Sequence, residues 1–454
     1  MNKQQSDNIM GTMPIPKLVI TMGVPLMLSM LSQALYNIVD SMFVSYIGEN
    51  ALTAVSLAYP IQNLMTAFAT GTGVGVNALL SMRLGQKNTE EANKVAKHAF
   101  FLAACTYIVF CIFGLFFIES YYKTQTSDPE ILAQSILYTE ISVYVSFGVF
   151  GVIACNRLLQ STGKTFLGMI VQMSGVVINI ALDPLLIFGL AGFPKLGIAG
   201  AAWATVIAQI SSFALGIFFN LKYNTELNLS LKKFKPHKEI ILRIYKVGIP
   251  SIAMTSIGSI MVSCINIILA PFSSTAIAVF GVFFKLNSFA VMPVLGLNNG
   301  IVPIVAYNYG AKNKKRLNHT IYFSAILGFS LTLIMAIIFQ IFPLQLIKLF
   351  NPSPEMIEMG IPALRIMSLT FVIAGIGITF SGIFQAFGRA GFSLIMSLAR
   401  QLVVIVPLGY VLSLTGVLEA IWWAFPISEV VSVILGIVFM IKVKKTILLK
   451  IGNL

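Results

Sequence analysis

Long apolar stretches separated by short polar loops run through almost the whole chain. A helix needs about 20 apolar residues to cross the roughly 30 Å hydrocarbon core of a bilayer. Open sheets are excluded from lipid, and the stretches are apolar throughout, whereas the strands of a membrane barrel alternate polar and apolar. The pattern therefore predicts an all-α polytopic membrane protein with twelve transmembrane helices. The twelve segments are 17–47, 52–80, 97–118, 132–157, 165–190, 197–220, 239–271, 276–308, 319–342, 356–386, 392–414 and 417–441.

The composition supports a chain embedded in lipid. Hydrophobic residues make up 57% of the 454 residues and charged residues only 10%, which excludes a soluble globular protein. The net charge of +14 could suggest a nucleic-acid partner, but the basic residues cluster in short loops. With both termini in the cytoplasm, 24 of the 30 Lys and Arg fall on that side, and only Lys123, Lys195 and Lys348 fall outside. This asymmetry predicts a multi-pass protein of the cell membrane, plasma or inner, that binds no nucleic acid.

Sequence features of enzymes and cofactor sites are missing. The four cysteines lie inside apolar segments without metal spacing, so we expect free thiols. The first sixteen residues are polar and lack the apolar core of a signal peptide, so we expect the first span to be retained. No nucleotide-binding loop or nucleophile–base pair is found, which argues against an ATP-driven pump. We therefore expect no enzyme activity, no cofactor, and a monomer surrounded by lipid.

The two halves of the chain resemble each other at a constant offset of 225 residues. The longest loop, 221–238, separates them, so we predict an N-terminal six-helix bundle at 1–220, a cytoplasmic linker at 221–238 and a C-terminal six-helix bundle at 239–454. Because six is even, both bundles enter the membrane from the same side, which makes the repeat parallel. Three pairs of blocks carry it: Gly23-Val-Pro25 with Gly248-Ile-Pro250, Gly85-Gln-Lys-Asn88 with Gly310-Ala-Lys-Asn313, and Gln160-Ser-Thr-Gly163 with Gln385-Ala-Phe-Gly388.

Acidic side chains inside two spans are the main candidates for chemistry. At about 1.5 Å per residue, Asp40 lies roughly 13 Å from the Gly48 end of the first span, too deep to reach the headgroups freely. A carboxylate in a span is costly and usually faces the protein interior and has a function. The alternative is an acid that reaches water or pairs with a neighbour for packing alone.

Further oxygen-bearing side chains share this depth. Asp183 lies about 28 Å above Lys164 in the fifth span, and Thr205 lies about 12 Å below Gly197 in the sixth. Asn179 precedes Asp183 by four residues and lies on the same helix face. Two carboxylates, an amide and a hydroxyl suit a hard monovalent cation such as Na⁺, or shared protons. Burial and mutual repulsion of the two acids favour uptake of either ion.

The second bundle lacks this set. At the offset of 225, Asp40 corresponds to Ile265 and Asp183 to Leu408. We therefore expect ion coupling only in the first bundle. Arg400 and Glu429 lie near mid-depth in the last two spans, and we interpret them as a buried structural ion pair.

Several blocks of the sequence resemble one known family. They are YNIVD ending at Asp40, NIALDPLLIFG around Asp183, GIAGAAWAT ending at Thr205, and GIVPIVAYNYGAKN at 300–313. With the two six-span halves, they resemble the multidrug and toxic compound extrusion (MATE) family, and look closest to its DinF-like prokaryotic branch. The resemblance implies a secondary active exporter of amphipathic, cationic small organic compounds, coupled to H⁺ or Na⁺ and working by alternating access.

The resemblance also implies roles for individual residues. It places the ion or proton site at Asp40, Asn179, Asp183 and Thr205, with no metal other than a possible Na⁺. Residues expected to line the substrate cleft are Gln33, Tyr36, Met27, Met173 and Lys285, and Pro25 is expected to be a hinge in the first span.

Alternatives remain open at two of these positions and for the function. Gln33 could serve helix-to-helix hydrogen bonding, and Lys285 could extend to the membrane interface. A flippase of lipid-linked glycans would share the fold but should line its cavity with cations, whereas this chain carries acids. A membrane enzyme acting on lipid would need a catalytic cluster, and the three histidines are scattered near loops.

The loop 221–238 tests the topology. A single cysteine placed there in a cysteine-free variant should resist a membrane-impermeant thiol reagent added to intact cells, since we predict that it is cytoplasmic. A cysteine at Lys123, predicted to lie outside, is the matched control and should be labelled. Rapid labelling of the loop would contradict the twelve-span topology.

Overall fold

Helices make up nearly all of the structure. The computed structural model describes residues 8–230, 234–350 and 352–448, and this part of the chain contains helices and loops but no strand. Ten helices there are long and apolar enough to cross a membrane, and two bent pairs of helices bring the number of spans to twelve. The predicted all-α, twelve-span fold class is confirmed.

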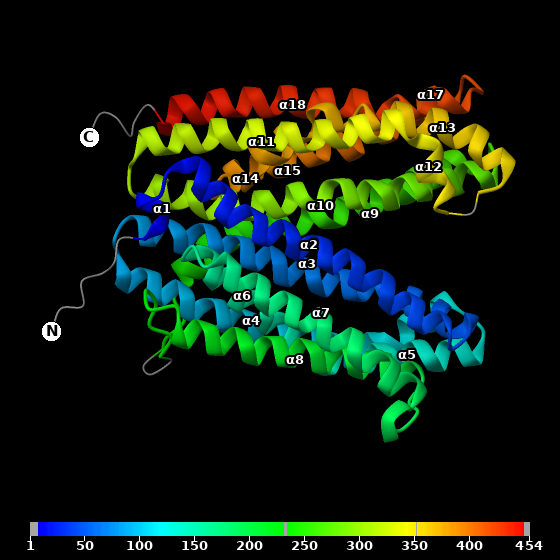
Figure 1. The fold of residues 1–454 in the computed structure, drawn as a ribbon, viewed down its shortest axis with the longest axis horizontal. Coiled ribbons are helices and arrows are strands. Elements are labelled where there is room, and N and C mark those ends of the chain that lie inside the picture. The colour runs from blue at the N-terminus through cyan, green and yellow to red at the C-terminus, as the bar shows by residue number, and fades with distance from the viewer. Residues whose placement is uncertain (1–7, 231–233, 351, 449–454) are drawn as a thin grey trace. The chain divides into compact units, whose positions relative to one another are not determined.

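Seven main helices form the first six spans, and Figure 1 labels them α2 to α8. The fourth span is the pair α5 and α6, which is bent by 44°. Two short elements, α1 (Ile9–Thr12) and η1 (Leu190–Gly192), accompany them. The helices are α2 (Ile15–Ser45), α3 (Glu49–Gly85), α4 (Thr89–Gln125), α5 (Pro129–Tyr144), α6 (Phe147–Ser161), α7 (Thr165–Phe188) and α8 (Ile198–Lys222).

The last six spans follow the same order. Their fourth span is again a bent pair, α13 and α14, at 47°. A π-helical segment, η2, joins α15 to α16 within the eleventh span. The elements are α9 (Lys238–Leu269), α10 (Ser274–Gly310), α11 (Lys314–Ile341), α12 (Pro343–Lys348), α13 (Pro354–Ser368), α14 (Phe371–Ala386), α15 (Ala390–Leu398), η2 (Ala399–Ile405), α16 (Val406–Ser413), α17 (Leu418–Trp422), α18 (Ala424–Val443) and η3 (Lys444–Leu448).

Matching local geometry shows that the sequence repeat is a structural repeat. Helices α3 and α10 each have 37 residues and begin 225 positions apart. After each helix a lysine adopts a left-handed conformation, Lys87 with φ 56° and Lys312 with φ 55°. The next residue, Asn88 or Asn313, caps the following helix by accepting a backbone N–H three residues on, at 3.0 and 3.1 Å. The same asparagine cap satisfies otherwise unpaired N–H groups in both halves.

The compact units of the structure do not follow the chain order strictly. Among the described residues, one unit comprises Asn8 and those within 28–248, and the other comprises 9–27 and those within 249–448. Helix α2 therefore belongs to the second unit up to Met27 and to the first unit from Leu28. Helix α9 changes unit in the same way between Gly248 and Ile249. The domain boundaries predicted at 220 and 239 stay a prediction.

Glycines allow the exchanged helix halves to pack within their new units. In the first unit, a Cβ on Gly75 of α3 would overlap the carbonyl oxygen of Ile244 in α9. In the second unit, a Cβ on Gly296 of α10 would lie 2.6 Å from the Cα of Met27 in α2. Small residues are the usual means by which helix backbones approach closely in lipid, where the hydrophobic effect does not drive helices together.

Replacing Gly75 by alanine tests this close approach. We expect Gly75→Ala to lower the thermal stability of the purified protein by about 1–3 kcal/mol, because α3 and α9 must move apart. Gly281→Ala is the matched control, since a Cβ at that helical position in α10 meets nothing within 4 Å. Equal melting temperatures for the two variants would contradict the proposed packing constraint.

Candidate ion-binding site

The four residues predicted to bind the ion all belong to the first unit. They lie on the unit-1 part of α2, on α7 and on α8. Asp40 and Asp183 each precede the last residue of their helix by five positions, and Thr205 follows the first residue of α8 by seven. All are buried: Asp40 is 9% exposed, Asp183 0%, Asn179 1% and Thr205 7%.

Asn179 connects α7 to α8 through hydrogen bonds. In the orientation that satisfies both ends of its amide, the nitrogen donates to Asp183 Oδ2 at 3.0 Å. The amide oxygen accepts from the backbone N–H of Thr205 at 3.1 Å and from its hydroxyl, Oγ1, at 3.3 Å. The Thr205 hydroxyl also lies 3.3 Å from the Tyr36 hydroxyl. These contacts join three helices through one polar network, in which every buried partner is hydrogen-bonded.

Asp40 is the incompletely satisfied member of the set. Its Oδ1 is buried and has no hydrogen-bond partner in the described part of the chain. Asp40 is within electrostatic range of Asp183, and both acids act on the Tyr36 hydroxyl. An orphaned carboxylate oxygen beside a second carboxylate fits a proton or a hard cation as its missing partner.

Small side chains hold the helices around these polar groups. An apolar cluster joins Val44 of α2, Ala54 and Ala58 of α3, and Ala201 of α8, all less than 2% exposed. Because alanine occupies little space, the helix backbones approach and bring the side chains of α2, α7 and α8 within hydrogen-bonding reach. Closely packed apolar side chains thus lie beside the acids.

Two polar residues near the site were missed by the sequence analysis. Tyr138 of α5 is 2% exposed, and its hydroxyl accepts a hydrogen bond from the Gln62 side-chain amide of α3 at 3.2 Å. Tyr138 lies within electrostatic range of both Asp40 and Asp183. The sequence does contain a signal for Tyr138 and Gln62, because both are polar side chains inside apolar spans.

The predicted cleft residues are divided between the units. Gln33 and Tyr36 are half-buried on the unit-1 part of α2, and Met173 of α7 is 38% exposed. Met27 is half-buried and Lys285 exposed, and both belong to the second unit. Their assignment to a substrate cleft stays a prediction.

The second unit has an ion pair in place of paired acids. The Arg400 guanidinium donates to Glu429 Oε2 at 3.0 Å, and Glu429 is 1% exposed. Arg400 lies in the π-helical segment η2, an element often found where a helix must reposition a side chain. The position equivalent to Asp40 is the fully buried Ile265. The two units therefore differ in buried charge although they share a fold.

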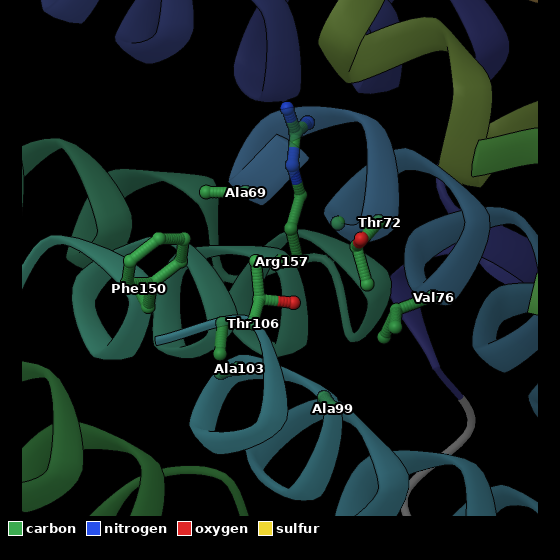
Figure 2. A pocket seen from close by; sticks show the side chains of 10 residues that line it. Ala69, Thr72, Val76, Ala99, Ala103, Thr106, Phe150 and Arg157 are labelled. Carbon is green, nitrogen blue, oxygen red and sulfur yellow. The ribbon is translucent and has the colours of Figure 1, made fainter. Parts of the chain in front are cut away.

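A small cavity elsewhere in the first unit is lined by a buried arginine (Figure 2). It has a volume of about 20 Å³, enough for one water molecule. The guanidinium of Arg157 donates to Gln160 Oε1 at 2.9 Å, and Thr72 Oγ1 is buried without a hydrogen-bond partner in the described residues. None of the four ion-site residues lines this cavity.

These features define a class of protein before any relative is considered. Twelve spans in two repeats, with a pair of buried aspartates in one unit and a buried ion pair in the other, are the features of a polytopic membrane transporter. The sequence model of the MatE family matches residues 25–185 and 250–411, and the chain belongs to this family. It is a multidrug efflux transporter and not an enzyme, as the sequence predicted.

Individual relatives extend over nearly the full length of the chain. The multidrug export protein MepA of Staphylococcus haemolyticus is 28% identical, over 92% of each chain. A multidrug resistance MATE family transporter of the MOP superfamily, solved in an outward-facing conformation, superposes with a TM-score of 0.91 at 25% identity, over 99% of each chain. A MOP superfamily transporter from Pyrococcus furiosus, whose binding pocket of reverse polarity suggests a different function, gives 0.89 at 26% identity over 97% of this chain and 99% of that one.

Thr205 tests the hydrogen-bond network. Thr205→Val keeps the shape but removes the hydroxyl that meets Asn179 and Tyr36, so we expect a loss of about 1–3 kcal/mol in thermal stability. Thr205→Ser retains the hydroxyl and should remain close to wild type. Melting curves of the purified variants make the comparison, and equal stability of the two would contradict the network.

Proposed function

We propose that the chain exports amphipathic organic cations in exchange for inward movement of H⁺ or Na⁺. The observation that carries this proposal is the pair of buried acids, Asp40 and Asp183, within one unit. Isolated buried carboxylates are costly in a membrane, so each favours a state in which a proton or cation compensates its charge. Ion binding on one side of the membrane and release on the other couple export to the ion gradient, which supplies the driving force. In this proposal the first unit performs this coupling, and the second unit, with its ion pair, does not.

The chemistry of the side chains supports ion binding by the first unit. In this proposal Asp40, Asn179, Asp183 and Thr205 bind the ion through oxygen atoms. Oxygen ligands suit Na⁺, and two neighbouring carboxylates equally suit a shared proton. Uptake of either ion satisfies the orphaned Oδ1 of Asp40. The gradient of the coupling ion supplies the energy for transport in this proposal, and no cofactor is needed.

The first span couples ion binding to the movement of cargo in this proposal. Pro25 lies three residues before the point where α2 passes from the second unit to the first. Its ring removes one backbone hydrogen bond and lets a helix bend, so a change at Asp40 can alter the course of α2. Pro25 is therefore the proposed hinge.

The proposed cargo is small, amphipathic and positively charged. Gln33, Tyr36, Met27 and Met173 offer polarizable or amphipathic surface, which suits varied organic molecules. Lys285 would tune the electrostatic field of the cleft. The name of the staphylococcal relative, a multidrug export protein, agrees with this cargo. We further propose a monomer in the plasma membrane with both termini in the cytoplasm.

Ethidium efflux from proteoliposomes tests the proposal. With a pH gradient and a Na⁺ gradient imposed separately, wild-type protein should transport under at least one of them. Asp183→Asn should abolish gradient-driven efflux, because a neutral amide neither exchanges a proton nor neutralises Na⁺. Ile265→Asp should not rescue it, since the second unit lacks the other oxygen ligands.

Glu119→Gln is the matched control for this experiment. Glu119 is an acid of the same unit whose carboxylate pairs with Lys123 at 2.7 Å near the exposed end of α4. This variant should keep wild-type efflux. Full gradient-driven transport by Asp183→Asn would reject the ion site.

A further inference from the structure

A second pocket of the first unit lies away from the acids. It has a volume of about 380 Å³, within the range of small-ligand sites, and is bounded by α4, α6, α8 and the loop before α9. Aromatic side chains form most of its wall, and one charged side chain contributes. We call it the aromatic pocket, and its principal lining residues are Lys97, Phe100, Phe101, Phe147, Phe213 and Phe234.

Specific contacts hold the loop that closes the aromatic pocket. The ring of Phe234 packs edge-on against the His98 ring, with 5.0 Å between the ring centroids. The centroids of the Phe234 and Phe101 rings lie 5.5 Å apart. The backbone N–H of His237 donates to His98 Nε2 at 2.8 Å, while His98 Nδ1 lies 2.7 Å from the Lys94 carbonyl oxygen. With both ring nitrogens engaged, His98 fixes the loop against α4. The pocket wall is therefore a built part of the unit.

The charged group of the aromatic pocket has no acidic partner. Lys94, one turn earlier on α4, pairs with Glu90 at 2.8 Å and Glu91 at 3.1 Å. Lys97 is half-buried and makes no ion pair within the described ranges of the chain. Its ammonium is thus available to an anion, and it repels the cationic compounds proposed as cargo.

The surface next to the aromatic pocket is apolar. Ala104 lines the pocket and is exposed, and Ile108, one turn further along α4, is 53% exposed. Tyr107 also lines the pocket. Its hydroxyl donates a hydrogen bond to the Tyr144 carbonyl oxygen at 2.8 Å, so this proton is not available to a ligand. An occupant therefore needs a long apolar part and one negative charge near Lys97.

We propose that the aromatic pocket binds one acyl chain of an anionic phospholipid whose phosphate pairs with Lys97. The membrane around α4 supplies this ligand, and phospholipid combines the two properties that the pocket selects. The site does not include the ion-binding acids, so it is independent of the coupling mechanism. A bound lipid would buttress the loop carrying Phe234 against α4.

Native mass spectrometry of purified protein tests the site by lipid titration. The probes are phosphatidylglycerol, phosphatidylcholine with the same acyl chains, and inorganic phosphate. Lys97→Gln should weaken phosphatidylglycerol binding about fivefold, the effect of one lysine near a lipid headgroup, and leave phosphatidylcholine unchanged. Lys97→Arg should restore it. Lys123→Gln, at the far end of the same helix, is the control and should bind as wild type.

A second variant fills the aromatic pocket. Ala104→Trp should remove one tightly retained lipid, whereas Ile108→Trp on the neighbouring exposed surface should not. Wild-type lipid binding by both Lys97→Gln and Ala104→Trp would overturn the proposal. Competition by inorganic phosphate would instead indicate a phosphate site, and loss of ethidium binding with unchanged lipid retention in Ala104→Trp would indicate a drug site. Either result would also reject the lipid assignment, and neither bears on Asp183.

Discussion

Close backbone packing without help from the hydrophobic effect is the constraint on which this structure depends. Between helices in lipid, apolar burial gives little advantage, because acyl chains are as apolar as leucine. The glycine contacts between α3 and α9, and between α10 and α2, supply van der Waals contact instead. They join equivalent pairs of helices in the repeat, where each exchanged helix half packs in the other unit. Alanines play the same part around the acids, and the hydrogen bonds of Asn179 require this proximity.

The two units share a fold but differ in how their buried charges are compensated. In the first, Asp40 and Asp183 are buried and Asp40 Oδ1 has no hydrogen-bond partner in the described part of the chain, which supports the proposed binding of an external ion. In the second, Glu429 has the Arg400 guanidinium as a tethered counter-ion, and the acid positions are apolar. The two units thus share close glycine packing between equivalent helices but differ in their buried charges. A buried charge must be compensated, but the compensating group can be an ion from solution or a side chain.

The aromatic pocket is a place where membrane lipid can take part in the packing of the first unit. Lysine and aromatic groups are arranged between α4, α6, α8 and the loop that begins the second half of the chain. An acyl chain there contacts helices through the same dispersion forces that join the helices to one another. Lipid thereby becomes a packing partner as well as a solvent.

Much of the fold follows from sequence alone, because its causes are local or repeated. Hydropathy determines the twelve spans, and the offset of 225 residues predicts the repeat seen in α3 and α10. The depth of Asp40, Asp183 and Thr205 also follows from counting residues along helices of known rise. Tertiary structure decided the rest. The exchange of α2 at Met27, the link from Asn179 to Thr205 and the proximity of Tyr138 depend on how helix faces meet. The rotation of each helix about its own axis decides which faces meet. It depends on the side-chain volumes of several segments at once, so no single stretch of sequence determines it.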